Sequence, residues 1–592
     1  MDPDDLLAAL DPEQRQVALA SRGAVCVLAG AGTGKTRAIT HRIAYAVATG
    51  IVNPAHVLAL TFTVRAAGEL RGRLRALGGD AGKVRAATFH SAALRQLTYF
   101  WPKVIGGRPP KLVESKLPLL REAARDLGLS VAGGALTDAV TEIEWAKVCQ
   151  THPDSYVFAA AAAGRAPAAG LEEVGRLYQA YEALRRDRQL IDFEAVLELT
   201  AAILLTEPMV AREVHGQFRY FTVDEFQDVN PLQKLLLDAW LGGREELCVV
   251  GDPQQTIYSF TGATSEYLRG FGRDFPGATV VRLVRDYRST PQVVAAANRL
   301  TAGGSAGPRG LAAAESSGAL VAQRPAGPDP VVTRYPDEVA EAAGVAAEAA
   351  ALIRRSVPAH EIAILLRINA HVERFERALA DGGVPYVVRG AERFYDRPEV
   401  RQALVLIRGA ARADGAGTDA TGPPQELPAA VRHVLASAGL TPAPPAARGA
   451  VRERWESLAA IAGLADDLAA ARPGATLAEF AAELAEREDT KHVPVAAAVT
   501  LATMHAAKGL EWDAVLIPGL VEGIMPIVHA RTAEAIEEER RLLYVALTRA
   551  RVRLVLSWAP ARTPGTEAAR QRSRFLADVF PAGGRTPVEG SR

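Results

Sequence analysis

The stretch from Val25 to Thr36, VCVLAGAGTGKT, combines the residue types that phosphate binding requires. An apolar, β-prone run leads into a glycine-rich turn, and Lys35 and Thr36 open a helical pattern. Glycines let backbone N–H groups face phosphate oxygens at a helix N-terminus, whose partial positive charge favours anions. The stretch predicts a P-loop for nucleotide and Mg²⁺, formed by Ala29, Gly30, Ala31, Gly32, Thr33, Gly34, Lys35 and Thr36. Ala29 stands where the pattern has its first glycine.

Two adjacent carboxylates follow a later apolar run, RYFTVDEFQDVN. ATP hydrolysis requires one acid for Mg²⁺ and one to orient and deprotonate water, and the pattern predicts Asp224 and Glu225 for these roles. The next strand pattern, ELCVVGDPQQ, ends near Gln255, which we expect to contact the γ-phosphate. Upstream of the P-loop, the amide of Gln14 can donate to and accept from adenine.

Aromatic and polar residues recur at other predicted strand ends. Open α/β sheets bind ligands at the carboxyl ends of their strands, and aromatic rings there can stack on bases. The candidates are Phe62, Thr63, His90, Tyr258 and Phe260. Tyr287 is a candidate for stacking on adenine, and Arg288 and Arg549 for contacting phosphate. The alternative is that the aromatic residues are core residues and Arg549 lies on a solvated helix face.

The elements that must position these residues follow a strand-turn-helix rhythm, which predicts an α/β fold with parallel sheets. At 592 residues the chain is too long for one core. A helical insertion is predicted between Trp101 and Leu190, and a second α/β rhythm without a P-loop follows from about Glu361.

Composition narrows the class of protein. Lys plus Arg and Asp plus Glu are 68 each, which excludes a broadly basic nucleic-acid binder but not a local basic groove. Three widely spaced cysteines favour a reducing interior over a disulfide framework. We find no leader and no apolar run long enough to cross a bilayer, so we expect a cytoplasmic protein.

An ordered series of motifs extends this interpretation. It comprises LDPEQRQ, AGAGTGKT, LTFTVRAAGEL, ATFHS, VDEFQDVNPLQ, VGDPQQTIYSFTGA, DYRST, LLRINA, TMHAAKGLEW and EEERRLLYVALTRAR. The series resembles the superfamily 1 helicases of the UvrD, Rep and PcrA type. The resemblance implies ATP-driven 3′ to 5′ movement on single-stranded DNA, with ATP and Mg²⁺ as cofactors and single-stranded or 3′-tailed duplex DNA as partner. DNA repair or recombination is the implied setting.

The family architecture implies two RecA-like domains closing on ATP, each with a helical insertion. The implied ranges are 1–95 and 196–285 for domain 1A, 96–195 for 1B, 286–409 and 491–592 for 2A with a C-terminal tail, and 410–490 for a reduced 2B. This last segment is rich in alanine and proline. We expect its helices to be too mobile and too small for a core equivalent to 2B.

Residue roles carry over by motif. The resemblance assigns Gln14 to adenine, Tyr287 to stacking on it and Glu511 to the ribose. It assigns Gln255, Arg288 and Arg549 to the γ-phosphate. The implied DNA contacts are Phe62, Thr63, His90, Tyr258, Phe260, Arg367, Asn369 and His505. The chain departs from the usual motifs at Val64, Arg65, Ser259, Phe260 and Thr261. Thr261 lacks the charge of the usual arginine, which predicts a weaker grip on phosphate.

Two alternatives stay open at this point. One is an ATP-driven translocase that clears proteins from DNA with little strand separation, which the reduced 2B favours. The other is a subunit of a helicase-nuclease complex, although no carboxylate cluster for two metals follows the last motif. Self-association and protein partners stay open as well.

Overall fold

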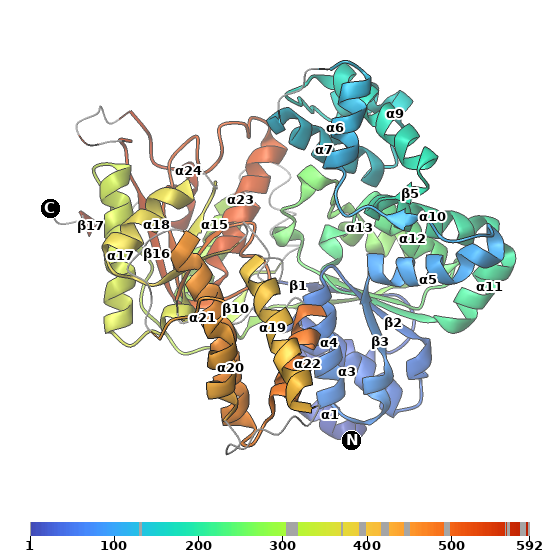
Figure 1. Cartoon of the computed structure of the whole chain (residues 1–592), viewed down its shortest axis with the longest axis horizontal. Helices are drawn as coiled ribbons and strands as arrows, with labels where there is room; N and C mark the ends of the chain where they lie inside the picture. Colours follow the sequence, from blue (N-terminus) through green and yellow to red (C-terminus); the bar gives the residue numbers. More distant parts are fainter. Residues whose placement is uncertain are drawn as a thin grey trace. The chain divides into compact units, whose positions relative to one another are not determined.

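The computed structural model describes residues 2–129, 133–303, 318–368, 371–389, 398–415, 426–442, 450–489, 498–562, 564, 569–580 and 588–589. The chain divides into two compact units, Met1–Val284 and Arg285–Arg592. Each unit has its own parallel sheet and its own group of additional helices (Figure 1). The predicted α/β class with parallel sheets and helical insertions is confirmed. None of the described helices has the length and apolar character needed to span a membrane.

The sheet of the first unit has six strands in the order β3-β2-β6-β7-β1-β8, each parallel to its neighbours. The strands are β1 (Val25–Ala29), β2 (Val57–Thr61), β3 (Arg85–Thr88), β6 (Tyr220–Val223), β7 (Leu247–Gly251) and β8 (Thr279–Leu283). Because all strands run the same way, their carboxyl ends meet at one edge of the sheet. The predicted P-loop and the predicted acid pair are therefore brought to the same edge.

Helices cover both faces of this sheet, which explains why its inner strands β2, β6, β7 and β1 are mostly apolar. Alternate strand residues such as Leu58 and Val249 pack with α5 (Phe89–Val104), α10 (Phe193–Thr206), α11 (Pro208–Gln217) and α12 (Pro231–Leu241). The residues between them, such as Ala59 and Val250, pack with α1 (Pro3–Ala8), α2 (Pro12–Leu19), α3 (Lys35–Ala48) and α4 (Val64–Ala76). The strand ends are thus held by two buried cores.

The helical insertion of the first unit has a separate core. Its helices are α6 (Leu117–Asp126), α7 (Gly133–Val148), α8 (Tyr156–Ala162) and α9 (Leu171–Asp187), flanked by the paired strands β4 (Lys111–Leu112) and β5 (Leu190–Ile191). Buried ion pairs join Lys147 to Glu182 and Asp192 at 2.6 and 2.8 Å. The boundaries expected near residues 95 and 195 fall inside α5 and α10, both of which pack on the sheet.

The sheet of the second unit has seven strands in the order β13-β14-β12-β15-β16-β11-β17, again parallel. They are β11 (Val331–Arg334), β12 (Ile362–Leu366), β13 (Tyr386–Arg389), β14 (Val499–Thr503), β15 (Trp512–Ile517), β16 (Ala550–Trp558) and β17 (Val588–Glu589). A small pair, β9 (Arg285–Asp286) and β10 (Val321–Ala322), stands apart from the sheet. The accompanying helices are α15 (Pro291–Gly303), α17 (Glu338–Arg354), α18 (Val372–Asp381), α23 (Ala533–Leu547) and α24 (Arg574–Val579).

The helices between β13 and β14 correct one expectation. They are α19 (Pro398–Gly415), α20 (Leu427–Ala436), α21 (Ala450–Ala471) and α22 (Leu477–Asp489), and they pack side by side (Figure 1). Fully buried residues such as Ile407, Val431 and Ile461 give them a common core. The segment therefore has a core of its own, because its alanines and leucines allow close helix packing. The boundary expected at residues 409–410 falls inside α19.

Candidate functional site

The P-loop follows β1 and leads into α3. Gly32 and Gly34 have φ angles of 70° and 77°, a region that favours glycine, and Gly34 is the N-cap of α3. Thr33 Oγ1 donates to the carbonyl of Gly30 at 2.9 Å, which tightens the turn. Ala29 is the last residue of β1 and is not among the residues with positive φ, so its methyl group is accommodated. The loop has the backbone shape that phosphate binding needs.

Gln14 lies directly against this loop. Its side chain is 3% exposed, and Nε2 donates to the carbonyl of Thr33 at 3.0 Å. A Cβ atom at Gly34 would lie 2.6 Å from this Nε2, so the glycine leaves room for the amide. The structure thus brings Gln14 to the P-loop, with its amide nitrogen holding the loop.

The acid pair follows β6 at the same sheet edge. Glu225 N–H donates to Asp224 Oδ1 at 2.9 Å, and Glu225 has a φ of 52°, which is unusual for a residue with a side chain. Such strained positions cluster at functional sites. Lys35 Nζ lies 3.2 Å from Glu225 Oε1, so the P-loop lysine and the second acid form an ion pair. Burial lowers the pKa of Lys35, but the charges of Glu225, Asp252 and Asp224 raise it overall.

Two further residues, Gln227 and Asp252, connect the acid pair to Gln255. Gln227 is fully buried; its Nε2 donates to Glu225 Oε2 at 2.6 Å, and its Oε1 accepts from Asp252 N–H at 3.0 Å. Asp252 Oδ2 in turn accepts from Gln255 Nε2 at 2.8 Å. A Cβ atom at Gly251 would lie 2.4 Å from Gln227 Oε1, so the glycine keeps this path open. Gln227 and Asp252 were not predicted as site residues, although they belong to the motifs VDEFQDVNPLQ and VGDPQQTIYSFTGA.

Thr36 and Asp224 supply hard oxygen atoms suited to Mg²⁺. Burial, reinforced by the charge of Glu225, raises the pKa of Asp224 to about 7. A nearby cation would relieve this buried carboxylate, so the pair fits a divalent ion that is also held by phosphate oxygens. Among the described residues, no group of three or more His, Cys, Asp or Glu could hold a metal by itself.

The aromatic candidates of the first unit differ in exposure. Phe62 is partly buried against the sheet core, and its ring centroid lies 6.1 Å from that of Phe89. Phe260 is 48% exposed, and its centroid is 6.2 Å from that of Tyr258. Burial raises the pKa of Tyr258 to about 12. Phe260 therefore offers the most ring surface of the three predicted rings.

Thr63 and His90 lie at the ends of the two neighbouring strands. Thr63 is the N-cap of α4, and its hydroxyl accepts from Ala66 N–H at 3.1 Å. His90 packs edge-on against Phe193, with ring centroids 6.0 Å apart. Burial, with a smaller effect of Lys116, lowers the pKa of His90 to about 4, so its imidazole is neutral at neutral pH.

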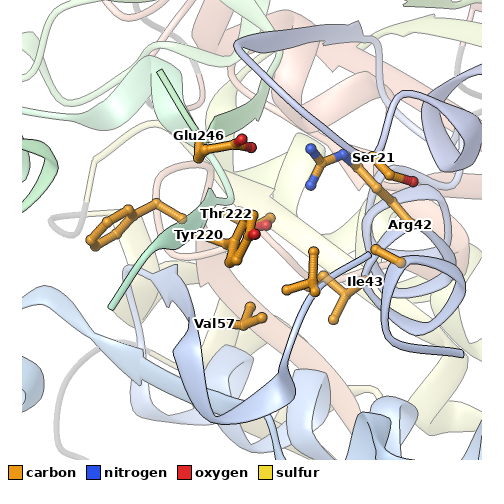
Figure 2. A pocket seen from close by; sticks show the side chains of 10 residues that line it. Ser21, Arg42, Ile43, Val57, Tyr220, Thr222 and Glu246 are labelled. Atoms are coloured by element: carbon orange, nitrogen blue, oxygen red, sulfur yellow. The ribbon is translucent and has the colours of Figure 1, made fainter. Parts of the chain in front are cut away.

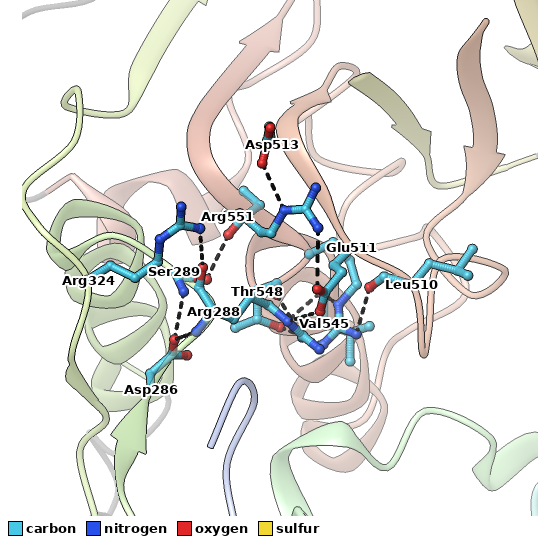
Figure 3. Close-up of polar contacts among 12 residues, drawn as sticks. Asp286, Arg288, Ser289, Arg324, Leu510, Glu511, Asp513, Val545, Thr548 and Arg551 are labelled. Carbon is cyan, nitrogen blue, oxygen red and sulfur yellow. Dashed lines mark hydrogen bonds and ion pairs between the residues drawn. The ribbon is translucent and has the colours of Figure 1, made fainter. Parts of the chain in front are cut away.

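In the second unit, predicted phosphate and ribose contacts lie together (Figure 3). Arg288 Nε lies 2.5 Å from Glu511 Oε2, and Asp286 Oδ1 accepts from Arg288 N–H at 2.8 Å. Burial raises the pKa of Glu511, but Arg288, Arg551 and Arg549 lower it overall. Tyr287, next to Arg288, is 45% exposed. Arg288 and Glu511 were predicted separately, and here they form one ion pair.

Arg549 is buried, and its guanidinium is hydrogen-bonded to residues close to it in the second unit. Its side chain is 2% exposed, and the guanidinium donates to Val545 O at 2.9 Å, Leu510 O at 3.2 Å and Thr548 Oγ1 at 3.1 Å. The alternative of a solvated helix face is wrong, because Arg549 follows the end of α23 and is enclosed there. The nearby Arg551 pairs with Asp513 and Glu511 (Figure 3). It also pairs with Glu361, and none of these ion pairs was predicted from the motifs.

The predicted DNA contacts of the second unit form another cluster. Arg367 follows β12 and makes a bidentate ion pair with Glu539 of α23, at 2.7 and 2.9 Å. His505 lies nearby; burial and the charge of Arg367 lower its pKa to about 4. Asn369 lies outside the described residues. Glu539 is thus a residue that sequence reasoning missed.

A small cavity in the first unit lies away from all these residues. It is lined by residues at or near the starts of strands, including Val57, Tyr220 and Glu246, together with Ser21 and Arg42 (Figure 2). Because the strands are parallel, this end of the sheet is opposite to the P-loop. The cavity is therefore separate from the candidate site.

Comparisons with known proteins agree with this geometry. The UvrD/REP helicase N-terminal domain matches residues 10–276, and the UvrD-like helicase C-terminal domain matches residues 281–416 and 433–561. ATP-dependent DNA helicase UvrD2 of Mycobacterium tuberculosis is 50% identical over 601 residues, covering 99% of this chain and 84% of that protein.

Two more distant relatives also match nearly the whole chain, at lower sequence identity. ATP-dependent DNA helicase UvrD1 of Mycobacterium tuberculosis is 30% identical, and ATP-dependent DNA helicase PcrA of Bacillus subtilis is 29% identical. Each comparison covers 97% of this chain and 86% of the relative. The motifs, the two parallel sheets and these similarities lead to one conclusion: the chain belongs to the UvrD/Rep helicase family.

Proposed function

We propose that this protein is an ATP-dependent DNA helicase that moves 3′ to 5′ on single-stranded DNA, in DNA repair or recombination. The main support is the network at the sheet edge of the first unit, in which Lys35, Glu225, Gln227, Asp252 and Gln255 form one connected path. Such a path links the place where phosphate binds to the group that activates water and to a group that senses the γ-phosphate. The relatives named as ATP-dependent DNA helicases support the same activity.

In this proposal the side chains exchange partners when ATP binds. Lys35 leaves Glu225 for the β- and γ-phosphates, which frees the Glu225 carboxylate to accept a proton from the attacking water. Gln227 keeps that carboxylate oriented through its 2.6 Å hydrogen bond. Gln255, Arg288 and Arg549 are assigned to the γ-phosphate, Gln14 and Tyr287 to adenine, and Glu511 to the ribose.

Thr36 and Asp224 would hold Mg²⁺. When bound, Mg²⁺ neutralises phosphate charge and so favours displacement at the γ-phosphate. The cation would also bring the pKa of Asp224 down from its raised value.

Single-stranded DNA is assigned to the rings and polar groups at the other strand ends. Phe62, Tyr258 and Phe260 would stack on bases, and stacking contributes roughly 1–3 kcal/mol per base. Thr63, His90, Arg367, Asn369 and His505 complete the proposed track. His90 and His505 are neutral at neutral pH, so they would contribute hydrogen bonds rather than charge.

Strand separation on three substrates tests this function. Duplexes with a 3′ tail, with a 5′ tail and with blunt ends are compared in ATP and Mg²⁺. We expect the 3′-tailed duplex to be separated fastest, because loading on a 3′ tail directs 3′ to 5′ movement into the duplex. Faster separation of the 5′-tailed duplex would contradict the proposed polarity.

A translocase that clears proteins from DNA is the second candidate. It is favoured by the short insertion that contains α19–α22, residues 398–489, because a short insertion leaves less surface for holding a duplex. Displacement of streptavidin from biotinylated single strands, measured beside strand separation, decides between the two. Displacement without separation would favour the clearing role. Nothing among the described residues favours the helicase-nuclease alternative.

A further inference from the structure

Arg165 connects the helical insertion of the first unit to the loop that carries Phe260. It lies between α8 and α9, and its side chain is 16% exposed. The guanidinium donates to both carboxylate oxygens of Glu142 at 2.8–3.0 Å and lies over the Trp145 ring at 4.5 Å. Its remaining nitrogen, Nη1, donates to the carbonyl of Phe260 at 3.3 Å. One partly buried side chain thus holds the main chain at Phe260.

The carboxylate that orients Arg165 is itself fixed. Glu142 lies on α7, its side chain is 6% exposed, and it also accepts from Tyr156 Oη at 2.8 Å. A planar guanidinium held on two edges and on one face has little rotational freedom. Its contact with the Phe260 carbonyl is therefore a rigid one.

The same loop contacts the end of α7 at a second point. Gly262 has a φ of 91°, and a Cβ atom there would lie 2.8 Å from Val148 Cγ1. Just beyond it, Thr264 N–H donates to Val229 O at 3.2 Å, in the segment that follows the acid pair. At its other end the loop begins at Gln255, which is bound to Asp252. The loop therefore runs from the phosphate-sensing amide to the exposed ring, with its far end held by the insertion.

We propose that Arg165 is a positioning residue that couples the Gln255 end of this loop to the Phe260 ring. The main chain held at Phe260 acts as a fixed point for the loop. A shift of Gln255 on hydrolysis therefore moves the Phe260 ring about that point and against a base. Without that fixed point, the loop absorbs the shift. This inference rests on the proposed function, because it requires ATP-driven movement on single-stranded DNA.

The test measures how much ATP is consumed per nucleotide travelled. Arrival of the protein at a labelled 5′ end gives the rate of movement, and phosphate release gives the rate of hydrolysis. For Arg165→Ala we expect several-fold more ATP per nucleotide, with the KM for ATP and the DNA-stimulated kcat close to wild type. Arg176→Ala, which removes an exposed arginine of α9, is the matched control. Unchanged coupling in Arg165→Ala overturns the proposal.

A second variant separates positioning from simple destabilisation. Arg165→Ala leaves the Glu142 carboxylate buried without its cation, which alone lowers stability. The double variant Glu142→Gln, Arg165→Ala removes that charge. Recovery of Tm with coupling still poor supports the proposal; recovery of both overturns it. If wild type shows no DNA-stimulated ATPase at all, the proposed function fails rather than the role of Arg165.

Discussion

The two sheet edges that carry the predicted nucleotide ligands are stabilised differently. In the first unit the site residues hold one another, as in the path from Lys35 through Glu225 and Gln227 to Asp252. In the second unit the ion pair between Arg288 and Glu511 is of the same kind, but Arg549 is held by main-chain carbonyls and a hydroxyl. The first arrangement can rearrange when a ligand exchanges one partner. The second arrangement depends on main-chain groups that the fold places. A substitution there is therefore expected to lower both the stability of the protein and its activity.

The first prediction concerns the interdependent network and has the largest expected effect. Glu225→Gln should slow hydrolysis by about 10²–10⁴-fold, the usual contribution of a general base, while nucleotide still binds. Lys35→Ala should instead weaken nucleotide binding, because its proposed role is to neutralise phosphate charge. Steady-state ATPase and equilibrium binding of a fluorescent ATP analogue distinguish the two effects. Glu246→Gln, an acid paired with Arg22 at the opposite end of the sheet, is the control. Normal hydrolysis in Glu225→Gln would remove Glu225 from its proposed role.

The second prediction concerns Glu341, a buried acid of the second unit whose hydrogen-bond donors are uncharged. Glu341 Oε1 accepts from Ser557 Oγ at 2.6 Å and from Gly519 N–H at 2.9 Å. Burial raises the pKa of Glu341 to about 7, above its unfolded value near 4.5. Its contribution to stability is therefore fully present below about pH 4.5 and is lost as pH rises through about 7.

Glu341→Gln should remove this pH dependence, since an amide oxygen accepts the same two hydrogen bonds. At pH 8 the variant should be more stable than wild type by up to about 3 kcal/mol. Urea unfolding between pH 5 and pH 8 measures the difference. An equal stability gap at both pH values would show that Glu341 is not the titrating group.

The third prediction compares Arg549 with Arg288. Arg549→Ala removes a donor from three acceptors, of which Val545 O keeps a second donor, Thr548 Oγ1 at 3.0 Å. An acceptor that is left buried without a donor costs about 1–3 kcal/mol. We expect loss of both Tm and ATPase for Arg549→Ala. For Arg288→Ala we expect loss of ATPase with a smaller change in Tm. Equal Tm losses would show that the two arginines are equally structural.

The fourth prediction has the smallest expected effect on catalysis. The helices α19–α22 have their own core, so removal of residues 398–489 leaves the sheet core of the second unit intact. We expect most of the DNA-stimulated ATPase to persist in this deletion variant, while strand separation declines. Loss of the ATPase in a variant that keeps its circular dichroism would show that these helices are part of the motor itself.

The sequence was informative wherever glycines, lysines and acids follow a predicted strand. Parallel strands bring such residues to one edge, so the meeting of Lys35 and Glu225 followed from topology alone. The hydrogen-bond partners of these residues could not be predicted from the topology. Gln227 and Glu539 both lie in the quoted motifs, but their partners Asp252 and Arg367 are 25 and 172 residues away in the sequence, and the sequence does not show these pairings.

The helices themselves were predicted, but the packing of those in 410–490 was predicted least well. Alanine- and proline-rich composition suggested mobile helices in 410–490, yet small residues allow the close packing seen around Ile407 and Ile461. Packing between helices depends on which faces meet, and composition does not encode that. The roles assigned to individual site residues and the 3′ to 5′ polarity stay predictions.

The central claim is that DNA controls hydrolysis at the strand ends of the first unit. Steady-state ATPase of the wild-type protein, with and without saturating single-stranded oligonucleotide, tests it most directly, with Glu225→Gln as the blank. We predict a low basal rate that rises strongly with DNA, because the proposed γ-phosphate ligands Arg288 and Arg549 belong to the second unit and, in this proposal, must be engaged for turnover. A rate that oligonucleotide leaves unchanged would contradict this account.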